Sequence, residues 1–273
     1  MAIIRPFRGY RYNKEKVENR GAVLAPPYDS IDEDEQHKLY DLDKYNIVRV
    51  IRGMEYEDDT EADSCYTRAK KYLDDWISSG VLVRDKKPAI YLYEQRLEYH
   101  HATYANRGFV VQMRLCDIEE GPVMPCEEAV LKNKVDRSQL LSAVGANISM
   151  VNCMYIENER AITDCMQAIS ARTPDMECTV EDGTQQKLWI VDDEEEILKI
   201  QHLLDEHTFF LIDGQSRYEI ALDYAKKRKK ADPEHTGDED YNYIMTLLTN
   251  AYTDGLSQFP FHRLIRFRRE FRE

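Results

Sequence analysis

A short run of polar and small residues, Asp213 to Arg217 (DGQSR), separates the apolar stretch Thr208–Ile212 from a helical stretch over Arg217–Lys230. A helix start offers free backbone amides to an anion, glycine lets the backbone approach it, and arginine can hold two of its oxygens. The run therefore predicts a phosphate site where a buried strand meets a helix. A structural alternative is that Ser216 and Glu219 form a helix capping box.

A second candidate is the run Leu24 to Asp29 (LAPPYD), in which two prolines fix the backbone and remove two hydrogen-bond donors. We expect this rigid loop to present Tyr28 and Asp29 to a site. The structural alternative is that Asp29 or Ser30 caps a helix beginning near Ile31, with Glu33 completing a capping box from Ser30.

A third candidate is the polar segment 117–147, which contains Glu127, Lys134 and Arg137. Lys134 and Arg137 are three residues apart at an expected helix start, where a lysine, an arginine and free amides can bind an anion together. Surface ion pairing accounts for the same residues without a ligand, so both interpretations stay open.

Several classes of protein are excluded or disfavoured by what the sequence lacks. The glycine-rich patterns of P-loop and dinucleotide-binding proteins and the G-x-S-x-G of hydrolases do not occur. The formal net charge of −14 argues against nucleic acid as a partner. The six cysteines lack zinc spacing, so we expect reduced thiols and no metal site. Without a signal peptide or a long apolar run, we expect a cytosolic protein and no membrane contact.

The elements that would position these residues indicate a mixed α+β fold. The 273 residues and 42% hydrophobic content suffice for one large or two small cores. Runs rich in β-branched and aromatic residues predict strands over 2–4, 47–51, 89–93, 108–115, 149–156, 188–191, 208–212 and 242–249. Apolar periodicity predicts helices over 66–78, 136–143, 160–171, 192–206 and 217–230.

Ordered runs along nearly the whole chain resemble a family called domain of unknown function 1015, often described as ParB-like. The runs are RPFRGYRYN, APPYD, KYNIVRVIRG, YLDDWISSGVLVRDKKPAIYLYEQ, RGFVVQMRL, KNKVDRSQLL, DGQSRYEIALDY and GLSQFPFHRLIR. Typical members are longer, and this chain stops soon after His262 and Arg263, so we expect a short member or a truncated chain.

The resemblance implies a single α+β domain over residues 1–273, with a mixed sheet, flanking helices and family-specific insertions. Its core would resemble ParB and sulfiredoxin and would combine about residues 1–55 with about 186–265. Proteins of that superfamily include nucleotide hydrolases, sulfiredoxins and kinases that phosphorylate free serine using ADP or ATP. The loop at their helix start binds nucleotide phosphates.

The usual family turn reads Asp-Gly-His-His-Arg-Tyr-Glu, and this chain keeps all of it except the two histidines, which Gln215 and Ser216 replace. A second departure is Cys126 before Glu127, where the family commonly has His-Glu. Histidine can bind phosphate and also carry a proton near neutral pH, whereas glutamine and serine only form hydrogen bonds. Phosphate binding is therefore expected to survive better than proton transfer.

These observations predict a protein that binds a nucleotide or another phosphorylated small molecule. As an enzyme it would be a phosphotransferase acting on a small hydroxylated metabolite with ATP or ADP and Mg²⁺, and Asp29, Glu127 or Asp213 would be the base. The phosphate-binding residues would be Gly214, Gln215, Ser216, Arg217, Lys134, Arg137, His262 and Arg263. The alternative is a non-catalytic binding or regulatory module, and the third possibility is ParB-like nucleic-acid binding.

Overall fold

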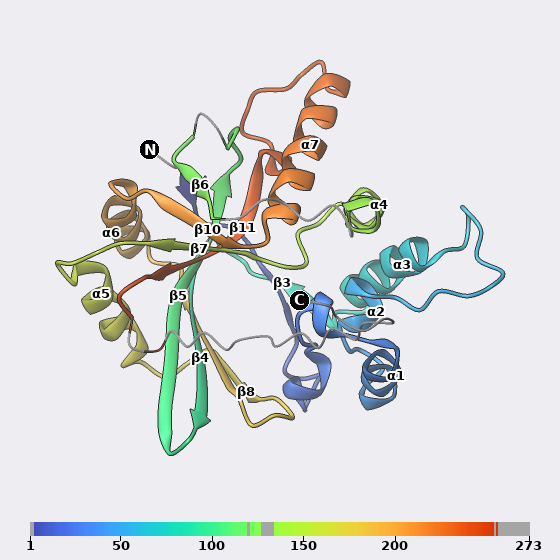
Figure 1. Ribbon diagram of the computed structural model, residues 1–273, viewed down its shortest axis with the longest axis horizontal. Helices are drawn as coiled ribbons and strands as arrows, with labels where there is room; N and C mark the ends of the chain where they lie inside the picture. The colour runs from blue at the N-terminus through green and yellow to red at the C-terminus, as the bar shows by residue number, and fades with distance from the viewer. Residues whose placement is uncertain (1–2, 119–120, 127–133, 254, 256–273) are drawn as a thin grey trace, which may run out of the picture.

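The computed structural model describes residues 3–118, 121–126, 134–253 and 255, which form an α+β protein around a nine-stranded mixed sheet (Figure 1). The helices are α1 (Glu33–Leu42), α2 (Val48–Ile51), α3 (Cys65–Ser78), α4 (Lys134–Val144), α5 (Ala161–Ser170), α6 (Glu194–Asp205) and α7 (Gln215–Ala231). The strands of the sheet are β1 (Ile4–Arg5), β4 (Ile90–Tyr99), β5 (Ala102–Arg114), β6 (Val123–Pro125), β7 (Val151–Tyr155), β8 (Met176–Thr179), β9 (Gln185–Val191), β10 (Phe209–Asp213) and β11 (Tyr243–Asn250).

The strand order is β6-β10-β7-β11-β5-β4-β9-β8, and β1 pairs with β5 just past the point where the pairing with β4 ends. Two pairs are parallel, β10 with β6 and β11 with β7, and the other pairs between described strands of this sheet are antiparallel. A separate two-stranded ribbon joins β2 (Tyr10–Tyr12) to β3 (Leu82–Arg84). The sheet therefore brings β1, near the start of the chain, together with strands from the middle of the chain and with β10, which the candidate turn follows.

The two faces of the central strands have different surroundings, because successive side chains of a strand point to opposite faces. In β4, Ile90 and Leu92 are buried in the main core, whereas Tyr91 packs in a smaller cluster on the other face. In β5, Phe109 and Val111 repeat the first pattern, and Val110 repeats the second. Both faces of the sheet are therefore apolar.

The main core lies between the sheet and the helices α5 and α6, which Figure 1 shows together on one side of the strands. These helices contribute apolar side chains at three- and four-residue spacings, as an amphipathic helix packed on a sheet requires. The residues they bury are Ile162, Met166, Ile169, Ile197, Ile200 and Leu204. Helix α7 adds Tyr218 and Ala221 to this core and packs against β7, β11 and α4.

Helices α1 to α4 form a second group on the other side of the molecule (Figure 1). They have two apolar clusters of their own, one that joins α2, α3 and α4 and a smaller one that joins α1 and α2. Helix α3 illustrates why the sequence folds there. Ser64 and Thr67 form a reciprocal capping box at its start, and Gly80 follows its end with a positive φ of 71°. Between them Ala69 and Trp76 lie buried on one face of the helix.

The predicted elements agree with the observed ones except at residues 47–51, where a strand was expected and the structure has α2. Asn46 explains the difference. Its side-chain oxygen accepts a hydrogen bond from the Val48 amide at 2.9 Å, and its Nδ2 donates to the carbonyls of Ala22 and Leu24 at 2.8 Å each. These bonds fix a turn that the β-branched composition alone disfavours.

Helix α1 begins at Glu33 and not near Ile31, because Asp32 is its N-cap and accepts from the Glu35 amide at 2.9 Å. The capping box expected from Ser30 is therefore wrong, and the Ser30 hydroxyl donates to the Pro27 carbonyl. All six cysteines lie among the described residues and are free thiols. None of the helices described here combines the length and the apolar character needed to cross a membrane.

Candidate functional site

The turn after β10 has the geometry that the sequence predicted. Phe209 and Leu211 are buried, the strand ends at Asp213, and α7 begins at Gln215. Gly214 has a φ of 90° and serves as the N-cap, so the chain reverses through a conformation that favours glycine. The expected capping box from Ser216 is wrong, since Ser216 already lies inside the helix.

Arg217 folds back over this turn. Its Nη2 donates to Asp213 Oδ2 at 2.6 Å. A Cβ added at Gly214 would lie 2.7 Å from Arg217 Nη2 and 2.9 Å from its Nε, closer than real Cβ atoms approach other atoms. The glycine is therefore needed twice, for its backbone conformation and for the room that it leaves for the guanidinium.

Arg137 comes to the same region from α4. Its Nη2 donates to both carboxylate oxygens of Asp29, at 3.1 and 3.0 Å, and its guanidinium carbon lies 4.7 Å from the centre of the Tyr28 ring. The Tyr28 hydroxyl donates to Asp136 Oδ2 at 2.6 Å. Burial, followed by that hydrogen bond, raises the pKa of Tyr28 to about 12, so the phenol stays neutral near pH 7.

Tyr28, Arg137 and Arg217 line one pocket of about 80 Å³, which we call the arginine pocket. Its remaining wall is mostly apolar, with Asn147 and Ser149 as further polar residues. The Nε atoms of Arg137 and Arg217 are both buried, and within the described part of the chain neither has a hydrogen-bond partner. Guanidinium groups bind acceptor oxygens well, so a pocket lined by two arginines favours a ligand with acceptor oxygens.

The carboxylates that now pair with these arginines are largely exposed. The Asp29 side chain is 65% exposed and that of Asp213 is 59% exposed, against 13% for Arg137 and 19% for Arg217. Ion pairs with an exposed partner are weak and readily exchanged. A phosphate could therefore replace or join either aspartate, while the arginines stay held by the protein.

Other predicted site residues lie near the turn but, among the described residues, they are not part of the arginine pocket lining. Lys134 Nζ pairs with Glu219 Oε2 at 2.5 Å, which ties the start of α4 to α7. Gln215 Nε2 donates to Glu219 Oε1 at 3.2 Å. Gly214 and Ser216 shape the turn and the first turn of α7.

The predicted convergence of scattered segments on the Arg217 turn can be followed for only part of the set. Asp29 lies beside the arginine pocket through its pair with Arg137. Glu127, His262 and Arg263 fall outside the described residues. Among the three candidate bases, the two that are described, Asp29 and Asp213, both accept from a guanidinium.

A second, polar pocket of about 450 Å³ shares Tyr28, Ile51 and Leu140 with the arginine pocket. Asp136 lines it and accepts from the hydroxyls of Tyr28 and Tyr66, at 2.6 and 2.8 Å. Sequence reasoning expected the proline loop to present Tyr28, but it did not predict the bonds to Asp136, because Tyr28 and Asp136 are 108 residues apart. The only local signal was the rigid proline pair before Tyr28.

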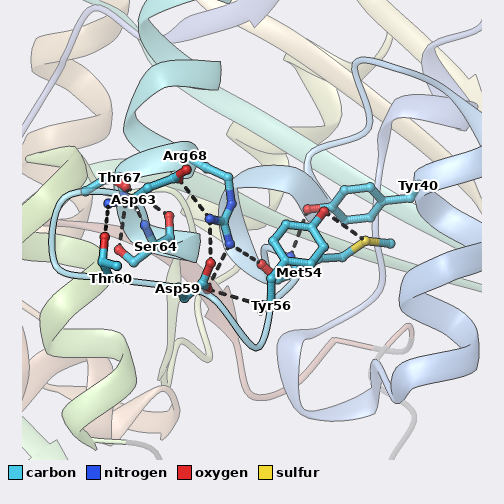
Figure 2. Close-up of polar contacts among 9 residues, drawn as sticks. All are labelled: Tyr40, Met54, Tyr56, Asp59, Thr60, Asp63, Ser64, Thr67 and Arg68. Carbon is cyan, nitrogen blue, oxygen red and sulfur yellow. Dashed lines mark hydrogen bonds and ion pairs between the residues drawn. The ribbon is translucent and has the colours of Figure 1, made fainter.

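One wall of the polar pocket is the loop after α2, and Figure 2 shows how α3 holds it. Arg68 Nη1 donates to Asp59 and Asp63 at 2.7 and 2.9 Å, and its Nη2 donates to the Met54 carbonyl at 2.8 Å. The Arg68 guanidinium lowers the pKa of the Asp59 carboxyl. Because Met54 and Tyr56 line the pocket, this network fixes its rim.

The described residues contain no group of three histidine, cysteine or acidic side chains placed to hold a metal ion. The carboxylates nearest the arginine pocket already accept from arginine or tyrosine. This donor set fits an anion held by guanidinium groups better than a cation held by a protein cage.

The fold and the site together define an α+β protein with a buried two-arginine pocket at the junction of a sheet and a helical group. The chain belongs to the family described as Protein of unknown function (DUF1015), whose model matches residues 4–273. Neither the curated proteins nor the solved structures include a significant match to this chain.

Proposed function

We propose that this protein binds a nucleotide or another phosphorylated small molecule, with the phosphate in the arginine pocket. The observation that carries the proposal is that the side chains of Arg137 and Arg217 line the same pocket, while the carboxylates that pair with them are largely exposed. The two guanidinium groups offer donors to several phosphate oxygens at once. A volume of about 80 Å³ suits a phosphate group.

The test is a calorimetric titration with pyrophosphate, ADP and ATP, with and without Mg²⁺. Arg217→Ala and Arg137→Ala should each weaken binding by about 10- to 100-fold, the loss of one charge-assisted hydrogen bond. Arg172→Ala is the matched control, since Arg172 pairs with Glu196 outside the pocket. Equal affinities for Arg172→Ala and Arg217→Ala, or no binding by the wild-type protein, would contradict the proposal.

If the protein is an enzyme, the proposed activity is that of a phosphotransferase, which transfers the bound phosphoryl group to a hydroxylated acceptor. The adjoining polar pocket supports it, because a hydroxylated acceptor bound there would meet the phosphate beside their shared residue Tyr28. Nucleotide-bound Mg²⁺ would supply charge neutralisation on the phosphates. Asp29, Asp213 and Glu127 stay candidates for the base that accepts the acceptor's proton.

The alternative is a binding or regulatory module without catalysis. Gln215 and Ser216 favour it, since they stand where the usual turn of the family has two histidines, and neither side chain can shuttle a proton near neutral pH. The resemblance to ParB and sulfiredoxin remains a prediction. So does a core formed by about residues 1–55 together with about residues 186–265.

An assay of ATP or ADP consumption across a panel of hydroxylated metabolites separates the two forms. Turnover that Arg217→Ala abolishes supports the phosphotransferase. Binding that depends on Arg217 without turnover of any panel member supports the module.

A further inference from the structure

A much larger hollow adjoins the arginine pocket and is lined by aromatic side chains. It has a volume of about 640 Å³ and lies between the second face of the sheet, the ribbon strand β2 and the helices α3, α4 and α7. We call it the tyrosine cleft, because its lining includes seven of the chain's 18 tyrosines. They are Tyr10, Tyr12, Tyr91, Tyr93, Tyr224, Tyr241 and Tyr243.

The cleft lies against the second face of the central strands. Tyr91, Tyr93 and Val110 alternate with the core residues of β4 and β5 and line the cleft. A volume of about 640 Å³ lies within the range of small-molecule sites, roughly 300 to 1,000 Å³. The size therefore fits a metabolite.

Several of the polar ends of these tyrosines are already used by the protein. The Tyr12 hydroxyl donates to the Tyr45 carbonyl at 2.8 Å, and that of Tyr91 donates to Asp85 Oδ2 at 2.6 Å. The Tyr93 hydroxyl is hydrogen-bonded to Gln186. These three residues therefore offer a ligand mainly ring surface, which favours flat aromatic groups over sugars or peptides.

The two hollows are neighbours. Both are lined by Leu141 of α4, by Ala146, Asn147 and Ile148 of the connection to β7, and by Ala221 of α7. The two hollows therefore adjoin along this connection, and a ring attached to a phosphate at Arg137 and Arg217 would have the tyrosine cleft as its neighbour.

We propose that the tyrosine cleft binds a flat aromatic ring carried on the phosphate group, so that the ligand is an aromatic phosphate ester. This rests on the proposed function for the position of the phosphate. Arg8, Arg11 and Arg228 also line the cleft, so ring substituents that accept hydrogen bonds are favoured there over cationic ones.

The experiment compares two monoesters of matched charge, methyl phosphate and 1-naphthyl phosphate, by calorimetry. Stacking of one ring on aromatic side chains should make the naphthyl ester bind about 30-fold more tightly. Tyr224→Leu should reduce this advantage by about fivefold, the effect of one aromatic contact, and leave methyl phosphate binding unchanged. Tyr10→Leu serves as a second variant. Because the Tyr10 side chain is 47% exposed, this position should tolerate the substitution without loss of folding.

Tyr252→Leu is the control, because Tyr252 is 65% exposed and lies outside the cleft. Equal affinity of the two esters, or an equal loss in Tyr252→Leu and in both cleft variants, would overturn the inference while leaving the phosphate site intact. If the naphthyl ester and 1-naphthol bind equally, and Arg217→Ala affects neither, the proposed function fails and the aromatic phosphate ester fails with it.

Discussion

At the scale of single residues, Gly214 both shapes the turn before α7 and leaves room for the Arg217 guanidinium. Its φ of 90° lies in the left-handed region, and a Cβ there would collide with the Arg217 guanidinium. Gly214→Ala should therefore lower the free energy of unfolding by about 1 kcal/mol through backbone strain. It should also weaken pyrophosphate binding by about tenfold, because Arg217 must move.

Gly183→Ala is the matched control for this substitution. Gly183 has a φ of 86°, but nothing lies within 4 Å of the position that its Cβ would take. Urea unfolding should report a similar loss of stability in both variants, and only Gly214→Ala should lose pyrophosphate affinity. An unchanged affinity in Gly214→Ala would mean that the position of Arg217 does not matter for binding.

The chemistry of the residues at the turn could be predicted from the sequence, but the distant residues that contact the site could not. Glycine before a helix and an arginine in its first turn indicate an anion site from local chemistry alone. The pairing of Tyr28 with Asp136, which positions the phenol, spans 108 residues and leaves no local pattern. The tyrosine cleft was missed for the same reason, although the alternating tyrosines of "IYLYE" in β4 indicated an apolar second face.

At the scale of elements, Asp136 joins three segments, since it accepts from Tyr28 before α1 and Tyr66 in α3 while lying on α4. Asp136→Ala should lower the free energy of unfolding by about 2 kcal/mol, because two partly buried phenols lose their acceptor. Asp136→Asn should lose less, since its carbonyl oxygen still accepts one bond.

Urea unfolding monitored by circular dichroism provides the measurement. Asp74→Ala is the control, because Asp74 is a half-exposed member of an i,i+4 pair with Lys70 on α3 and should cost about 0.5 kcal/mol or less. A loss in Asp136→Ala no larger than this control would show that the three segments are held by packing alone.

The loop before β11 makes a prediction about pH. Glu239 accepts from the Thr236 amide at 2.5 Å and from the Gly237 amide at 3.0 Å, and backbone hydrogen bonding, led by Thr236, lowers its pKa from 4.5 to about 2. A carboxylate with a lowered native pKa stabilises the fold above its unfolded pKa. That stability is lost as the pH falls from about 4.5 to about 2.

Glu239→Gln should therefore lower the melting temperature above about pH 5, and the difference from wild type should shrink as the pH falls towards 2. Differential scanning calorimetry across this range is the measurement. Glu234→Gln removes the same charge from the loop but leaves the Thr236 bonds in place. A pH-independent difference for Glu239→Gln, or the same profile in both variants, would contradict the assignment.

Most long elements were predictable because their apolar periodicity extends over several turns or strand residues, as in α3, α6 and β11. The short ones were not. Strands β6 and β8 have three or four residues and are defined by their neighbours in the sheet. Helix α2 depends on the long-range bonds of Asn46, which no local propensity contains.

At the scale of the whole molecule, α4 connects the two main cores. Val144 is buried in the core of the helical group, while Leu141 packs against the main core of the sheet. Both residues line the arginine pocket, which therefore lies at the junction of the two cores. A ligand bound there would contact both parts of the molecule, so it should stabilise them together by mass action.

The two tryptophans of the chain report separately on these cores, since Trp76 lies in the helical group and Trp189 in the sheet core, each 4% exposed. If residues 1–273 fold as a single domain, each tryptophan should lose its native fluorescence at the same urea concentration as the circular dichroism signal. Trp76→Phe leaves only the Trp189 fluorescence, and Trp189→Phe leaves only that of Trp76. The fluorescence transition of each variant is compared with the circular dichroism transition of the same variant, so a difference in stability between the two variants does not affect the comparison. Pyrophosphate should raise both midpoints. A tryptophan transition that precedes the dichroism transition, or a ligand shift confined to one tryptophan, would show that the two cores unfold as independent units.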